Sequence, residues 1–540
     1  MYKIVLVFCF LLFSCLGFSQ ILTVAESSNF ESTSSEKEVN DFIKKITKNS
    51  KIVRFETLAV SPEGRNIPLL IIADPLPKSA KDIKNDKRVV VYIQANIHGG
   101  EVEGKEASLM FARDLIAGMK KDILKNVIVL ICPNFNADGN EKISTLNRTH
   151  QNGPKNGVGL RYNGQALDLN RDAMKLESPE LNGLLKNVLN TWDPYIFVDC
   201  HTTNGSYHEE PVTFAWMMNP SGDESLIDFM EKDLMPAVSS TLLKDYKVEN
   251  CFYGEFIDMG KPELGWIEEA VEPRYIVNYM GIRNRLAILN ENYVYADYKS
   301  RVLGCYGLLN SIADYASQNG TKIKNLIQKA DQNTIQRGLN PSDRDSFPIE
   351  FKAFPLTEKI SIKTYEVEPK ADTTGWDKYQ KTDRKKTVIV PYIADYQPTL
   401  SVKFPFAYLL TIQDPDVLNL LKRHGIKVGK LNKAQVFEVE TFKIKELSPV
   451  LRMNQGHYNN AITGSFSKGK MEFNAGTYII RTAQPLATLA AYLLEPQSGD
   501  GFVFWNVLDK HLVPQWGRGF LPYPVYKILN KVEIEDIEVL

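Results

Sequence analysis

The sequence predicts an α/β fold, a mixed sheet flanked by helices, followed by a smaller β-rich domain. The run from 89 to 97 is apolar apart from Tyr92, Gln94 and Asn96, which is typical of a strand buried on both faces. Strand-like and helical patterns alternate from there to about residue 200, which indicates a sheet with parallel strands. Beyond residue 345 the pattern changes to β-branched alternation, as in 360–365.

The first elements lead up to the central strand. Residues 34–46 have helical periodicity, and Thr33 to Ser35 offer oxygens for its N-cap. Strand-like runs follow at 51–60 and 66–72 and are joined by a turn at 61–65. The central run 89–97 then precedes a predicted helix at 101–119 and a strand at 127–132.

The next elements continue the same alternation. The patterns predict, in chain order, a helix at 177–191, strands at 194–200 and 212–218, a helix at 223–242, a short apolar run ending at Leu289, and one or two long helices at 295–329. Two long connections, 133–166 and 254–284, are irregular. Connections of this length in a compact domain are usually functional, and ligands in open α/β sheets bind beyond the carboxyl ends of strands.

A chain of 540 residues exceeds the size at which single cores usually stop growing, so we expect at least two domains. The polar segment 333–348, which contains Pro and Gly, is the predicted boundary. It separates a first domain at 20–335 from a second at 345–540, which is β-rich with helices at 414–424 and 484–494. The second domain carries no recognisable metal or nucleophile cluster, and its role is an interaction or structural one by default.

The first 19 residues predict a secretory signal peptide, because one Lys precedes an apolar run and small residues near Gly17 to Ser19. Cleavage before Gln20 predicts an exported protein, periplasmic or extracellular. The segment Leu12 to Cys15 offers a lipoprotein box as the alternative, although Phe13 fits it poorly. No later apolar run approaches the length of a membrane span.

The overall charge and the cysteines exclude several classes. A net charge of -1 provides no basic footprint for nucleic acid, so partners are expected at a local site. Four cysteines follow the signal, too few in so long a chain for a disulfide framework. Cys251 and Cys305 are the one pair that we consider for a bridge, and the sequence leaves this open.

Three side chains predict a metal site. His98 and Glu101 follow the central strand in a His-Gly-Gly-Glu motif, and His201 ends the second apolar run. Strand alternation places Asp199 on the face of His201 and Cys200 on the other, so Cys200 is a poor ligand. Two imidazoles and one carboxylate are the three protein ligands that a catalytic zinc takes, which predicts one Zn²⁺ per chain.

Four polar clusters occur in a telling order: His98 to Glu101, Asp168-Leu169-Asn170-Arg171, Asp199-Cys200-His201 and Leu289-Asn290-Glu291. In this order they resemble the M14 family of zinc metallocarboxypeptidases, over about residues 25 to 320. The resemblance implies a metallocarboxypeptidase-like fold for the first domain. It also implies a zinc-dependent hydrolase that cleaves the C-terminal bond of a peptide with a free terminal carboxylate.

The resemblance implies further roles between the metal ligands. Asp168 would accept a hydrogen bond from His98, and Asn170 with Arg171 would grip the substrate's terminal carboxylate, which suits a planar guanidinium. The simpler alternatives are that Asp168 caps a turn and that Arg171 pairs with Asp172 on the surface.

The catalytic groups are implied in the same way. Glu291 would be the general base, although its flanking sequence departs from the family's usual Thr-x-Glu. The competing acids Glu268, Glu269 and Glu272 lie in polar sequence, which predicts solvated side chains. Arg148 would stabilise the oxyanion, with Arg161 as the alternative, and Tyr275 and Tyr279 both remain candidates for the tyrosine that caps the substrate.

Two other functions fit the same residues. The chain could be a zinc amidohydrolase acting on peptidoglycan stem peptides or N-acyl amino acids, because a fold does not determine its substrate. It could also be a non-catalytic binding protein, against which the complete ligand set and the candidate base argue.

Overall fold

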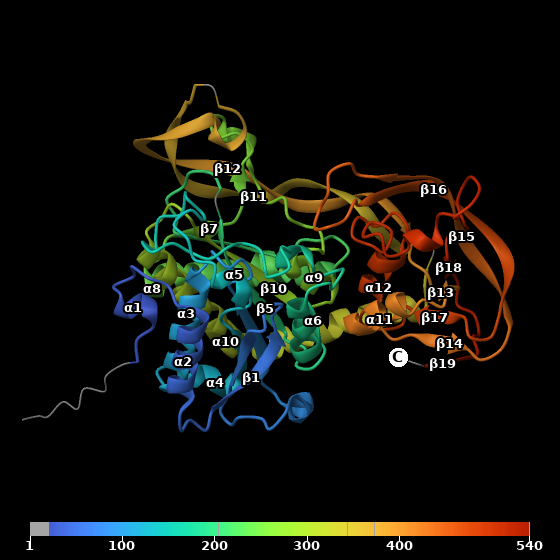
Figure 1. Ribbon diagram of the computed structural model, residues 1–540, viewed down its shortest axis with the longest axis horizontal. Helices are drawn as coiled ribbons and strands as arrows, with labels where there is room; N and C mark the ends of the chain where they lie inside the picture. Colours follow the sequence, from blue (N-terminus) through green and yellow to red (C-terminus); the bar gives the residue numbers. More distant parts are fainter. Residues whose placement is uncertain (1–20, 204, 343, 372, 539–540) are drawn as a thin grey trace, which may run out of the picture.

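An eight-stranded mixed sheet forms the centre of the α/β part of the chain (Figure 1). The computed structural model describes residues 21–203, 205–342, 344–371 and 373–538, so the predicted signal peptide lies outside the described residues. The strand order is β1-β2-β4-β3-β5-β10-β6-β7. The bounds are β1 Val53–Val60, β2 Asn66–Ile72, β3 Val89–Ala95, β4 Val127–Cys132, β5 Ile196–Thr203, β6 Val212–Trp216, β7 Asn250–Phe252 and β10 Leu286–Tyr293.

Three central strands carry or precede the predicted metal ligands and the predicted base. Strands β3, β5 and β10 are neighbours and run parallel, so their carboxyl ends meet at one edge of the sheet. The register pairs Glu291 of β10 with His201 of β5. Every residue of β3 is buried, as the continuous apolar run predicts.

Helices flank this sheet as the periodicity predicts. The first long one, α2, begins after Ser35, whose hydroxyl forms a capping box with Glu38. Helix α3 begins only at Glu103, because Glu101 belongs to the turn that follows β3. The main helices are α2 Glu36–Thr47, α3 Glu103–Ile116, α4 Lys121–Asn126, α6 Pro179–Leu184, α7 Glu224–Phe229, α8 Met235–Tyr246, α9 Ile276–Ile282 and α10 Tyr298–Leu339.

Helix α10 is longer than predicted. It continues through 42 residues to Leu339, into the segment that the sequence analysis assigned to a polar boundary. The helix has a kink at Asn319, where φ is -115° and ψ is 15°, and the first proline after its end, Pro341, comes only two residues later. Its last turn packs on the C-terminal part, because a side chain at Gly338 would overlap the backbone of Thr482.

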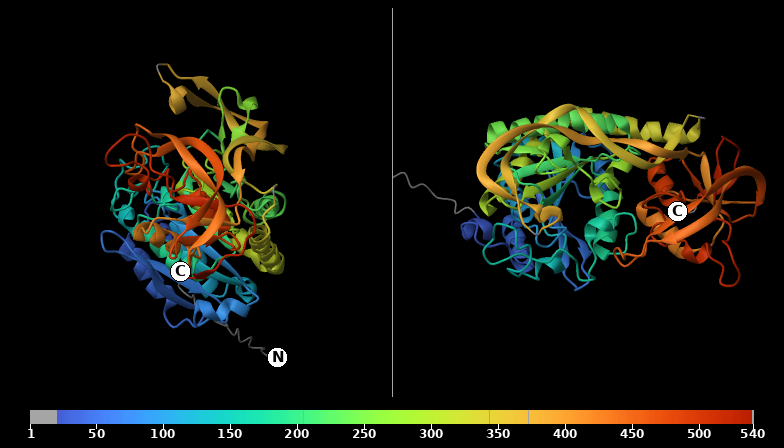
Figure 2. Two further views of the ribbon diagram at one scale, coloured as in Figure 1. Left: turned by 90° about the vertical axis from the view of Figure 1, so that its right-hand side faces the viewer. Right: turned by 90° about the horizontal axis from the view of Figure 1, so that it is seen from above.

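A long hairpin follows, made of β11 Ser346–Pro369 and β12 Tyr379–Lys403 (Figure 1, top). Strand β12 pairs with β9 Trp266–Ile267, which pairs with β8 Glu255–Phe256, so the hairpin shares a sheet with loops of the α/β part. Figure 2 shows the hairpin lying along the α/β part and leading to the C-terminal sheet. The division into domains at 335 and 345 stays a prediction.

The C-terminal part is β-rich, as predicted. Its sheet has the order β16-β15-β18-β13-β17-β14-β19, with all neighbours antiparallel. The helices predicted at 414–424 and 484–494 are confirmed as α11 Pro415–His424 and α12 Ala487–Leu494. The strands are β13 Ala407–Leu410, β14 Gly429–Leu431, β15 Gln435–Pro449, β16 Asn460–Phe473, β17 Tyr478–Arg481, β18 Val525–Ile528 and β19 Asp536–Glu538.

Cys251 and Cys305, whose pairing the sequence left open, form no bridge, since all four cysteines among the described residues are free. Helix α10 places Cys305 beside Cys200 of β5, with 4.0 Å between the sulfur atoms. None of the helices described between residues 21 and 538 combines the length and apolar composition that crossing a bilayer requires.

His424 joins α11 to the α/β part. Its imidazole is fully buried, donates from Nε2 to the carbonyl of Met174 at 3.0 Å and accepts at Nδ1 from the Tyr279 hydroxyl at 2.7 Å. Burial lowers the pKa of His424 to about 3, and the charges of Arg283 and Arg423 act in the same direction. The contact between the two parts therefore depends on a neutral histidine.

Acidification should weaken this contact. Between pH 6.5 and 3 the unfolded chain binds a proton that folded His424 does not, so stability is greatest above about pH 6.5 and falls as pH falls. We expect this group alone to account for a loss of about 2 kcal/mol between pH 7 and pH 5. Urea unfolding of the wild type and of His424→Gln at both pH values measures it, and the variant should lose less.

His457 provides a control of opposite sign. Its hydrogen bond with Glu177 raises its pKa, so its contribution is present at low pH and is lost as pH rises. His457→Gln should therefore steepen the loss on acidification. An unchanged pH dependence in His424→Gln would contradict the assignment.

Candidate metal and substrate site

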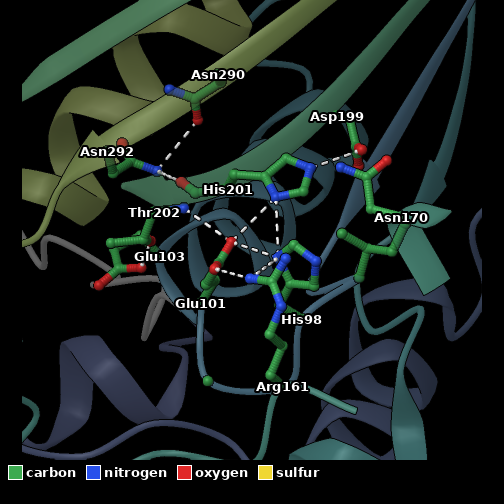
Figure 3. A network of polar contacts seen from close by, with 12 residues as sticks. His98, Glu101, Glu103, Arg161, Asn170, Asp199, His201, Thr202, Asn290 and Asn292 are labelled. Carbon is green, nitrogen blue, oxygen red and sulfur yellow. Dashed lines mark hydrogen bonds and ion pairs between the residues drawn. The ribbon is translucent and has the colours of Figure 1, made fainter. Parts of the chain in front are cut away.

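The three predicted ligands converge at the carboxyl edge of the sheet (Figure 3). His98 Nδ1 lies 3.1 Å from Glu101 Oε2 and 3.2 Å from His201 Nδ1, and His201 Nδ1 lies 3.0 Å from the same Glu101 oxygen. Side chains from two distant segments of the chain thus present one atom each to a common point. All three residues are buried.

The two glycines of the motif allow this approach. After β3 the chain turns, and the Glu101 amide donates to the His98 carbonyl at 2.9 Å. A side chain at Gly99 would overlap the backbone of Gly139 and Asn140, and one at Gly100 would lie 2.7 Å from the Gly159 carbonyl oxygen. The turn therefore brings His98 and Glu101 together only because neither glycine has a Cβ.

Carboxylates hold the other nitrogen of both imidazoles. His98 Nε2 donates to Asp168 at 3.0 Å, and His201 Nε2 donates to Asp199 at 2.7 Å. Each ring then directs the lone pair of Nδ1 toward the cluster, which is the arrangement of metal-ligating histidines. Asp168 also accepts from the Asn170 amide at 3.0 Å, so the turn-capping alternative holds as well.

These groups fit a zinc ion. A cation about 2 Å from each ligand needs the ligand atoms roughly 3.3 Å apart, close to the 3.0 to 3.2 Å observed. Two neutral imidazoles and one carboxylate are a zinc donor set, and the carboxylate partners complete it.

Burial and neighbouring charges shift the pKa values of the acids and histidines in and beside this cluster. Although burial opposes it, the neighbouring His98, Arg148 and His201 hold the pKa of Glu101 well below its usual range. Asp199 and Glu101 raise the pKa of His201. Burial raises the pKa of Glu291 to about 8, although His201 and the two nearby arginines favour its ionised form.

A cavity of about 290 Å³ opens at this point, and all seven predicted site residues line it. Glu291 faces it from β10, and its Oε2 has no hydrogen-bond partner in the described part of the chain. Among the lining residues are His98, Glu101, Arg148, Arg161, Asn170, Arg171, His201, Tyr275 and Glu291.

Both candidate arginines lie beside Glu101. Arg148 donates to Glu101 Oε1 at 2.8 Å and to the Thr202 carbonyl at 2.6 Å. Arg161 donates to Asp168 Oδ2 at 2.9 Å and lies 3.6 Å from Glu101 Oε1. Its side chain is more exposed, at 35% against 15% for Arg148.

The predicted carboxylate-binding pair also faces the cavity. Arg171 lies over the ring of Tyr275, 4.3 Å from its centroid. The alternative pairing with Asp172 does not occur, because Asp172 is buried and bonded to Lys175 at 2.9 Å. Tyr275 lines the cavity, whereas Tyr279 is buried against His424, so the structure separates the two tyrosines that the sequence could not.

One acid contradicts its sequence interpretation. Glu268 is 4% exposed and lines the cavity, whereas its polar neighbours predicted a solvated side chain. Tyr396 of β12 donates to its backbone carbonyl, so the distant hairpin covers this segment. Glu269, one residue on, is exposed as predicted, and Glu272 is half-buried.

Glu255 is a further acid of the site that no sequence pattern indicated. This residue of β8 also lines the cavity. Burial raises the pKa of Glu255 to about 7 and that of Glu268 well above the usual range of a carboxyl. Glu255 and Glu268 are separated in the sequence, so their common position at the cavity becomes visible only in the folded structure.

The chain is similar to known carboxypeptidases. A family model described as zinc carboxypeptidase, Peptidase_M14, matches residues 39–195, which include His98, Glu101, Asn170 and Arg171. Carboxypeptidase 2 of Trichophyton rubrum is 21% identical over 89% of this chain and 84% of its own length. Carboxypeptidase 2 of Trichophyton tonsurans is 23% identical over 87% and 81%. Among solved structures, carboxypeptidase A of Helicoverpa armigera is 15% identical, with a TM-score of 0.41 over 54% of this chain and 75% of its own.

Proposed function

We propose that this chain, a member of the M14 zinc carboxypeptidase family, is exported and removes the last residue of peptides with a free C-terminal carboxylate. The observation that carries the proposal is one cavity that holds the His98, Glu101 and His201 cluster together with Glu291 and Arg171. The first three would hold the metal, and the others would act on the substrate.

A zinc ion in this cluster supplies Lewis-acid chemistry, since it polarises a carbonyl and makes water acidic near neutral pH. Glu291 then takes the proton of the attacking water at its free Oε2 and delivers it to the leaving amine. In support of this role, Glu291 pairs with His201 in the strand register, and both residues line the cavity.

Two arginines divide the charges of the substrate. Arg148, held by Glu101 and the Thr202 carbonyl, would stabilise the oxyanion that forms when water attacks, with Arg161 as the alternative. Arg171 and Asn170 would bind the terminal carboxylate, which restricts attack to the last peptide bond. Tyr275 would close over the substrate beside Arg171.

The cavity supports a preference for a basic last residue. Glu255 and Glu268 line it, and Glu268 Oε2 has no hydrogen-bond partner within the described ranges. A Lys or Arg side chain would restore the ionised form of these acids and form charge-assisted hydrogen bonds. Trp216, Ala215 and Leu289 offer apolar contacts for its methylene groups.

A substrate panel tests the proposal. Zinc-loaded protein should release C-terminal Lys or Arg from peptides and leave amidated peptides intact. Cleavage of acyl amino acids or cell-wall stem peptides alone would favour the amidohydrolase, and inactivity on the whole panel would favour a binding protein. Cleavage of apolar C-terminal residues alone would leave the peptidase intact and overturn the basic preference.

Glu268→Gln should remove much of that preference. We expect kcat/KM for C-terminal Lys and Arg to fall by roughly 10- to 100-fold, because one charge-assisted hydrogen bond is lost. Peptides that end in Leu or Phe should be cleaved at nearly the wild-type rate. Glu269→Gln, the same change at the exposed neighbour, is the matched control, and an equal loss in both variants would contradict the role of Glu268.

A further inference from the structure

A second cluster of metal-ligating side chains lies outside the site described above. His208, Glu210 and Cys251 each offer one ligand atom, and these atoms lie within 4.8 Å of one another. All three residues are buried, with exposures of 2%, 3% and 8%. The cluster shares no residue with the His98, Glu101 and His201 cluster.

Two of its polar atoms face only each other, at a distance that is long for a hydrogen bond. His208 Nδ1 and Glu210 Oε2 have no hydrogen-bond partner among the described residues, and they lie 3.5 Å apart. An ion pair of this length is a weak one, and a cation between the two atoms would give each of them a direct bond.

Neighbouring residues fix the orientation of the His208 and Glu210 side chains. The other oxygen of Glu210 accepts from the Lys363 amide at 2.9 Å, which leaves Oε2 directed at the cluster. The His208 ring stacks on Tyr293 with 3.6 Å between centroids and meets the edge of Trp266. Metal-ligating imidazoles and carboxylates are usually held in place by neighbouring groups in this way.

We propose that His208, Glu210 and Cys251 bind a second zinc ion. A histidine nitrogen, a carboxylate oxygen and a thiolate are all zinc ligands, and three of them leave one tetrahedral position for water. Bonds of 2.0 to 2.3 Å need ligand atoms about 3.3 to 3.8 Å apart, so the cluster would tighten slightly around the ion. The cation would also deprotonate Cys251, whose pKa burial raises in its absence.

The place of this cluster suggests a structural role. Cys251 belongs to β7 at the edge of the large sheet, whereas His208 and Glu210 belong to the segment before β6. This segment pairs with β11, since His208 forms a bridge with Thr364 and the Glu209 amide donates to the Lys363 carbonyl at 2.8 Å. The ion would thus fasten the β11–β12 hairpin to the edge of the sheet.

Cobalt distinguishes this site from the first, because only the second contains a sulfur ligand. Protein stripped of metal and loaded with Co²⁺ should show a thiolate-to-metal charge-transfer absorption in the near ultraviolet. The zinc-loaded wild type should contain about two ions per chain, one for each cluster. A wild type without the absorption, or with a single ion, would overturn the proposal without any variant having to fold.

Variants then assign the ligands. Cys251→Ser should lose the absorption and one ion, and Cys305→Ser, which alters another buried thiol, should keep both. His208→Gln should lose the same ion, whereas His201→Gln should lose an ion but keep the absorption. Persistence of the absorption in Cys251→Ser, or its loss in Cys305→Ser, would show that the thiolate is not the one proposed.

Discussion

Glu291→Gln is expected to lower kcat by about 10³-fold or more while the protein keeps its metal. Gln has the size of Glu and can still donate and accept hydrogen bonds, but it cannot take a proton from water, and general-base catalysis contributes typically 10² to 10⁴-fold. Glu291 is not one of the three residues of the metal cluster, so the variant should still bind the metal. Steady-state kinetics with metal analysis of the same sample measures both.

The same substitution elsewhere in the cavity is the control for Glu291. Glu268→Gln also removes a buried acid from the cavity wall, and we expect it to spare peptides with apolar last residues. A general loss of activity in both variants would indicate a damaged cavity rather than a lost base. Wild-type kcat in Glu291→Gln would exclude Glu291 as the base.

His201→Gln is expected to abolish activity at every zinc concentration. The variant removes one of three ligands but leaves an amide that can still donate to Asp199, so the buried carboxylate keeps a partner. Asp199→Asn should be milder, because it changes only the group that orients His201. Loss of such a partner typically costs 10- to 100-fold in metal affinity or activity.

A titration of activity against buffered free zinc separates the two variants. The wild type should saturate first, Asp199→Asn should need roughly 10 to 100 times more free zinc, and His201→Gln should stay at background. If high zinc restored His201→Gln fully, His201 would not be a ligand. If Asp199→Asn matched the wild type, the hydrogen bond between Asp199 and His201 would have no part in metal binding.

The metal cluster could be predicted from the sequence because its parts depend on local rules. A buried strand has to be apolar, and residues at or just beyond its carboxyl end lie at the edge of the sheet, which places His201 near the end of β5 and His98 shortly after β3. Glu291 could be predicted in the same way, since it lies near the carboxyl end of β10, after the apolar run with which that strand begins. The caps and periodicity of α2 and α11 were local as well.

Features that arise from contacts between distant segments escaped the sequence analysis. Glu268 has polar neighbours along the chain, yet it is buried in a segment whose backbone hydrogen-bonds to Tyr396 and Ile393 of the distant strand β12. The question of a Cys251–Cys305 pair could be answered only from the packing of α10, which brings Cys305 to Cys200. The extent of α10 was missed because its last turns are stabilised by the C-terminal part, which no local pattern describes.

The shared sheet of β8, β9 and the β11–β12 hairpin makes the wall of the cavity depend on both halves of the chain. The groups that would break the peptide bond all precede residue 300, yet the wall that would choose which residue leaves is propped up by side chains after residue 390. A change in the downstream half would therefore alter which last residue is removed, while the catalytic groups stay in place.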